Sequence, residues 1–96
     1  MIQFDDRYQK NPSMVSREIA GEFILVPIRQ NVGDLESIYT LNETAARAWS
    51  LIDGKHTLAE IQETIVDEYS VREDQAQQDL IELIQELESI NAVVKV

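Results

Sequence analysis

The chain has 96 residues, 44% of them hydrophobic, and a formal net charge of −10 at pH 7. This length suits one domain with a single modest core. The absence of cysteine excludes a disulfide framework, a thiolate metal site and a cysteine nucleophile, and the acidic excess disfavours attraction to nucleic acid or anionic lipid.

The first residues, 1–13, are polar and show neither strand nor helix periodicity. We expect them to form an N-terminal arm, loose or pinned by side chains such as Phe4 and Tyr8, ahead of a single domain over 14–96. They lack the profile of a signal peptide, and no apolar run approaches the roughly 20 residues that cross a bilayer. The sequence therefore favours a cytoplasmic protein with no membrane partner.

Alternating and apolar segments predict three antiparallel strands. Residues 15–19 alternate in polarity, and a turn at 20–22 leads to the apolar run 23–26, which is typical of a hairpin. The polar stretch 29–36 then turns the chain into a third strand over 37–41.

Capping signals divide the second half of the chain into helices. Asn42 can cap a helix from about Glu43 to Asp53, which Gly54 would end in the left-handed conformation. Thr57 and Glu60 fit a capping box that opens a second helix, ending at Tyr69.

Ser70 and Glu73 fit another capping box, which would open a long third helix to about Ile90. Residues 92–96 follow as a short extended tail. The order of elements predicts an α+β fold that is winged-helix-like, with a three-stranded antiparallel sheet followed by three helices.

The inventory of catalytic groups is thin. His56 is the single histidine and lies in an expected turn, so a solvated turn residue or a staple residue is favoured over the activator of a hydroxyl nucleophile. Carboxylate pairs such as Asp79 with Glu82 and Glu82 with Glu86 have no loop of backbone oxygens beside them, so they are interpreted as solvated. We assign no catalytic residue, no metal and no cofactor.

A winged-helix outline also suggests a DNA-binding regulator. From Thr57 to Val94, however, the only basic residue is Arg72, so the helices that would enter a groove would bring carboxylates to a polyanion. DNA binding is kept as an alternative and is not favoured.

The third strand of a meander lies at an edge, where unpaired N–H and C=O groups can accept another chain. If the third helix packs near that strand, the two form a groove for an extended peptide. Ile81 lies about 100° around the helix from Leu80, on a flank with Gln77, Gln85 and Glu88. It is either a peripheral core contact or a residue that grips a ligand.

Several segments, in this order and spacing, resemble the PqqD-like family of precursor-peptide recognition elements. They are Gly21–Val26, Tyr39–Trp49, Leu51–Gly54 and Thr57–Ile61. Asp79 and the apolar positions that follow it also resemble the last helix of that family. The Leu-Asn, Trp and Asp-Gly positions are the most recognisable marks.

The resemblance implies a non-catalytic domain that binds the leader of a ribosomally made precursor peptide as an added strand, in the groove between the third strand and the third helix. The domain then delivers the peptide to a modifying enzyme, often a radical S-adenosylmethionine enzyme. The edge contacts would fall on Ile38, Tyr39 and Thr40. The helix wall, chosen from geometry, would comprise Gln77, Ile81, Ile84, Gln85 and Glu88.

The client could be a quinone precursor, a lasso peptide or another peptide product. A different use of the same edge would make the chain an assembly subunit that pairs with itself or with a larger enzyme. We expect a monomer or a weak homodimer.

Overall fold

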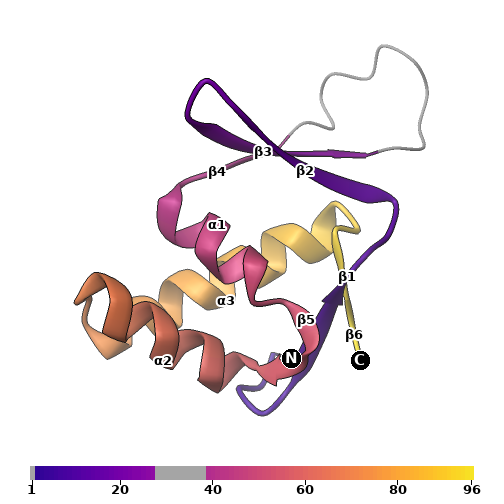
Figure 1. Cartoon of the computed structure of the whole chain (residues 1–96). Coiled ribbons are helices and arrows are strands. Elements are labelled where there is room, and N and C mark those ends of the chain that lie inside the picture. The colour runs from indigo at the N-terminus through magenta and orange to yellow at the C-terminus, as the bar shows by residue number, and fades with distance from the viewer. Residues whose placement is uncertain (1, 28–38) are drawn as a thin grey trace.

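Three helices and two small antiparallel sheets make up the described part of the chain, residues 2–27 and 39–96 of the computed structural model (Figure 1). The predicted α+β fold, with a three-stranded antiparallel sheet and three helices, is confirmed. The second sheet was not predicted.

The predicted meander is formed by β2 (Met14–Ile19), β3 (Glu22–Pro27) and β4 (Tyr39–Leu41), in the order β2-β3-β4. Ala20 and Gly21 join the first two strands with φ values of 53° and 81°. Positive φ at both central positions is the geometry of a type I′ hairpin turn, whose twist matches that of the strands.

Only part of the predicted third strand can be compared with the structure. The structure places its end, Tyr39–Leu41, in β4, which pairs with β3 from Leu25↔Tyr39 to Phe23↔Leu41. The start of that strand, including Ile38, and the polar stretch 29–36 lie outside the described residues.

The second sheet has the order β5-β1-β6 and brings together β1 (Arg7–Lys10), β5 (Asp53–Thr57) and β6 (Val93–Lys95). The expected arm therefore contributes a central strand, and Tyr8, only 3% exposed, anchors it in the core. The sequence predicted a turn where β5 lies. Short polar strands carry little periodicity, and their partners are distant in sequence, so local patterns cannot reveal them.

The first helix, α1 (Glu43–Ser50), begins at the predicted cap. The side chain of Asn42 accepts a hydrogen bond from the backbone N–H of Ala45. The helix ends before the predicted Asp53, because that residue and Gly54 belong to β5. Gly54 has the expected positive φ of 80°, within the strand.

The predicted capping box of the second helix is present. In α2 (Leu58–Tyr69) the Thr57 hydroxyl accepts from the backbone N–H of Glu60, and the Glu60 carboxylate accepts from the backbone N–H of Thr57. This reciprocal pairing satisfies two N–H groups that a helix start leaves free.

The capping box predicted for the third helix is wrong. Ser70 ends α2 in the left-handed conformation, with φ of 55°, and its backbone N–H donates to Val66. The N-cap of α3 (Glu73–Ser89) is Arg72, which makes no side-chain capping bond. Ser70 cannot serve both ends because the end of α2 determines its backbone conformation.

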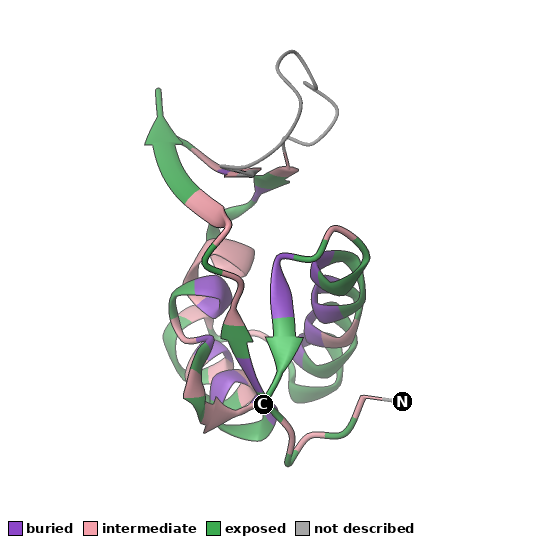
Figure 2. Ribbon diagram, turned by 90° about the vertical axis from the view of Figure 1, so that its right-hand side faces the viewer, coloured by how far each residue is buried: buried purple, intermediate pink, exposed green. Residues whose placement is uncertain are grey.

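The core is formed by the facing sides of the helices and the second sheet, and the meander adds Leu25 and Leu41 to it (Figure 2). Its largest fully buried side chains are Leu25, Ile52, Leu58, Ile61, Ile84 and Leu87. None of the helices in ranges 2–27 and 39–96 has the length and apolar character that crossing a bilayer requires.

Candidate functional site

One border of β4 carries no partner strand among the described residues, since β4 pairs with β3 alone. The chain's own tail does not cover this border, because β6 pairs with β1. The C-terminus lies at the second sheet, away from β4 (Figure 1). No strand of the described ranges 2–27 and 39–96 therefore occupies the backbone groups on this border, and such groups can accept another extended chain.

A cavity of about 290 Å³ runs between β4 and α3, and we call it the β4–α3 groove. Tyr39, Thr40 and Leu41 all line it, although side chains of successive strand residues point to opposite faces. The groove must therefore follow the border of the strand and not only one face of the sheet.

The floor of the groove is apolar. It is formed by the α1 residues Ala45 and Ala48, by Ile65 of α2, and by Leu80 and Leu83 of α3. All but Ala45 are buried. An apolar floor beside free main-chain groups provides the two components of strand-addition binding, which are backbone hydrogen bonds and side-chain pockets.

The α3 rim of the groove is acidic and consists of Asp79, Glu82 and Glu86. The side-chain amide of Gln75 donates to Asp79 at 2.9 Å, and Tyr39 donates its hydroxyl to Glu86 at 2.7 Å. The second bond joins the edge strand to the helix.

The environment of Tyr39 favours its neutral form. Partial burial, the hydrogen bond to Glu86 and the negative charge of Glu86 together raise the pKa of Tyr39 to about 12. The phenol therefore keeps its proton and remains a hydrogen-bond donor through the neutral range.

The structure brings two of the predicted site residues to the groove, Tyr39 and Thr40. None of the five predicted helix-wall residues lines it: Gln77, Ile81, Ile84, Gln85 and Glu88. Ile84 is 0% exposed in the core, and Ile81 is half-buried. Any contact of these five with a peptide stays a prediction.

The difference lies in which flank of α3 faces β4. The prediction chose the flank of Ile81, whereas Asp79, Glu82 and Glu86 lie on the flank that faces the strand. Glu88 instead lies near Tyr8 of β1, where burial of the phenol and, next to it, the charge of Glu88 raise the pKa of Tyr8. Helical periodicity marks the buried stripe but not which neighbour lies on each side of it.

His56 lies in β5 and does not line the groove. Its Nδ1 is 2.9 Å from Oδ2 of Asp53. The backbone N–H groups of His56 and Lys55 donate to Asp53 and hold the pKa of its carboxyl well below its usual range. His56 therefore lies in a strand and not in the predicted turn, and its contacts with Asp53 stabilise the local backbone.

Fold and groove together define a small winged-helix-like domain with a strand border open beside a helix. The family model described as coenzyme PQQ synthesis protein D (PqqD) matches residues 22–93. The chain belongs to the PqqD family, which confirms the resemblance predicted from its sequence.

Two solved structures share the fold. One is "TbiB1 in Complex with the TbiA(beta) Leader Peptide", with a TM-score of 0.71 and 24% identity, covering 88% of this chain and 93% of that one. The other is "Lasso peptide synthetase B1 complexed with the leader peptide", with a TM-score of 0.74 and 20% identity, covering 92% and 98%. No curated protein matches the chain.

Proposed function

We propose that this protein captures the leader of a ribosomally made precursor peptide as a strand added to β4, and presents it to a modifying enzyme. The observation that carries the proposal is the β4–α3 groove, which has an apolar floor and runs along a border of β4 that no described strand pairs with. The two proteins of similar fold were each solved with a leader peptide, which supports this use of the fold.

In this proposal the leader lies extended along Tyr39–Leu41 and exchanges main-chain hydrogen bonds with the free border. Alternate side chains of a strand point the same way and lie about 7 Å apart. One of them enters the apolar floor formed by Ala45, Leu80 and Leu83. Main-chain pairing provides affinity for any extended segment, and the floor selects among sequences.

The protein itself performs no chemistry in this proposal. It accelerates modification by holding the leader close to the enzyme, which raises the effective concentration of the substrate. A radical S-adenosylmethionine enzyme is the partner that we propose, and the cytoplasm is the compartment. Neither the DNA-binding regulator nor the assembly subunit gains support from the family or the similar structures.

Calorimetric titration of the full chain with the leader encoded by a neighbouring short open reading frame tests the proposal. We expect saturable binding, with amide chemical-shift changes concentrated at Tyr39–Leu41 and along the groove floor. Shifts scattered over the second sheet would contradict binding at β4.

A pair of substitutions in α1 sharpens this test. Ala45 lines the groove and Ala46 does not, although both are half-buried. Ala45→Leu should weaken leader binding about tenfold, because the added side chain fills the pocket that an apolar leader residue would otherwise enter. Ala46→Leu is the matched control and should leave affinity unchanged, with thermal unfolding of both variants reporting any loss of stability.

A further inference from the structure

The two sides of the β4–α3 groove differ in chemistry. Its floor is apolar, whereas its α3 rim carries Asp79, Glu82 and Glu86, and no lysine or arginine is among its described lining residues. A peptide strand bound there therefore meets an apolar surface and three carboxylates at once.

Among the described residues, no cationic side chain neutralises this rim. Across the described part of the chain, ion pairs are made by Arg47, His56, Arg72 and Lys95. None of these pairs includes a rim carboxylate. Glutamine amides approach Asp79 and Glu82, but they are neutral. Carboxylates about one helical turn apart repel each other, so a cation placed between them is favoured.

The rim carboxylates are not equivalent. Glu86 already accepts the Tyr39 hydroxyl, whereas Asp79 and Glu82 accept only from the glutamine amides of their own helix among the described residues. Three residues of helix rise about 4.5 Å, so one cationic side chain can reach both carboxylates. A guanidinium suits this task because it presents several donors in one plane.

We propose that the segment bound at β4 carries a lysine or arginine that pairs with Asp79 and Glu82, and an apolar side chain on the same face that enters the groove floor. This inference rests on the proposed function and specifies the chemistry of its substrate. The alternation of a strand places same-face side chains about 7 Å apart, which suits a basic and an apolar residue in an i, i+2 relation.

Selection of a random 12-residue peptide display library on the immobilised full chain tests the inference. We expect the wild type to enrich extended sequences with a lysine or arginine two positions from an apolar residue. The variant Asp79→Asn/Glu82→Gln should lose the preference for a basic residue and keep that for an apolar one.

The matched control is Glu63→Gln/Asp67→Asn on α2. Both residues are exposed and lie outside the groove, and this variant also removes two negative charges. In a second measurement, the basic residue of a selected peptide is replaced by glutamine. This replacement should weaken binding to the wild type and to the control variant about fivefold. It should leave binding to the Asp79→Asn/Glu82→Gln variant nearly unchanged. The control separates a local contact from general attraction to an acidic protein.

The outcomes distinguish the two proposals. The basic-residue inference would be overturned if the enriched peptides carried no basic residue. It would also be overturned if the glutamine replacement weakened binding equally to the wild type and to both variants. Either result would leave peptide capture standing. A wild-type chain that enriches no peptide would overturn peptide capture, and the inference with it. Circular dichroism of both variants establishes that the comparison is between folded proteins.

Discussion

The helices with the second sheet, which we call the helical base, differ from the meander β2-β3-β4 in how much they bury. Helix α3 alone contributes five buried residues, whereas the described part of the meander contributes only Leu25 and Leu41. The base therefore supplies most of the apolar burial that stabilises the fold. Of the strand borders in the described part of the meander, the one on β4 that faces away from β3 carries no partner strand and lies beside α3.

The largest expected effect compares one residue from each region. Leu58 is 0% exposed in the base, whereas Ile19 is 55% exposed near the hairpin turn. Leu58→Ala should lower the free energy of unfolding by about 2–5 kcal/mol because it leaves a cavity, and Ile19→Ala should change it by less than about 0.5 kcal/mol. Urea denaturation measures both, and equal losses would contradict the division into two regions.

A smaller effect is expected at the junction between the second sheet and α2. Thr57→Ala removes the hydroxyl that accepts from the N–H of Glu60, and it should cost about 1 kcal/mol of unfolding free energy. Thr57→Ser keeps the hydroxyl and serves as the control. Should alanine and serine prove equally stable by urea denaturation, the capping box would have no role in holding the base together.

The hydrogen bond between Tyr39 and Glu86 joins the meander to the base. Because Glu86 helps to raise the pKa of Tyr39 to about 12, Glu86→Gln should move that pKa back toward the usual value of about 10. Ultraviolet titration of tyrosinate, with Tyr39→Phe subtracted to isolate the signal, measures the change. An unchanged titration would show that burial alone determines it.

The sign of the alkaline effect on stability follows from the same shift. The pKa of Tyr39 is higher in the folded state than in the unfolded state. The contribution of Tyr39 to the free energy of unfolding is therefore fully present below about pH 10 and is lost as pH rises through about 12. Tyr39→Phe should reduce stability at neutral pH by less than about 1 kcal/mol, given the partial exposure of the pair.

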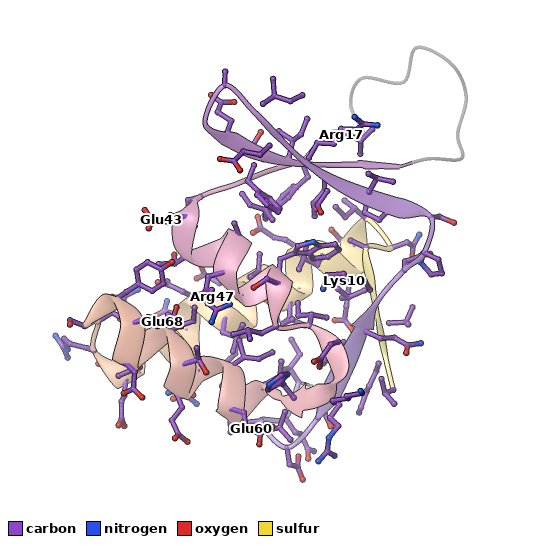
Figure 3. The ribbon with its side chains drawn as sticks, viewed as in Figure 1. Lys10, Arg17, Glu43, Arg47, Glu60 and Glu68 are labelled. Carbon is purple, nitrogen blue, oxygen red and sulfur yellow. The ribbon has the colours of Figure 1, made fainter. Side chains whose placement is uncertain are left out.

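The smallest effect is expected within the base, between α1 and α2. Arg47 donates two hydrogen bonds to Glu68, each at 2.8 Å, and the two side chains point toward one another (Figure 3). These bonds lower the pKa of Glu68. The contribution of Glu68 to the free energy of unfolding is therefore present above the unfolded-state pKa of about 4.3, and it is lost as pH falls through the folded-state pKa.

Glu68→Gln should therefore flatten the fall of stability with acidification, measured by urea denaturation between about pH 6 and about pH 3. Glu63→Gln, an exposed residue of the same helix, should leave that slope unchanged. A slope altered equally by both variants would indicate general charge repulsion and not the Arg47 pair.

Local signals in the sequence were enough for the elements whose bonds lie close along the chain. The turn at Ala20 and Gly21, the cap at Asn42 and the capping box at Thr57 each depend on neighbours within four residues, and each formed as predicted. The family, too, was recognised from such segments. An open border on the third strand was expected because a meander leaves its last strand at an edge.

The sequence alone determined the hairpin, the helix starts at Asn42 and Thr57, and the presence of an edge strand, because these depend on local backbone preferences. Tertiary structure decided the second sheet, in which Arg7 pairs with Thr57, and the use of Ser70 to end α2. It also decided that Asp79 and Glu82, and not Gln77 and Gln85, line the groove. Packing of α3 against its neighbours determines its rotation about its own axis, and that rotation brings one flank to β4.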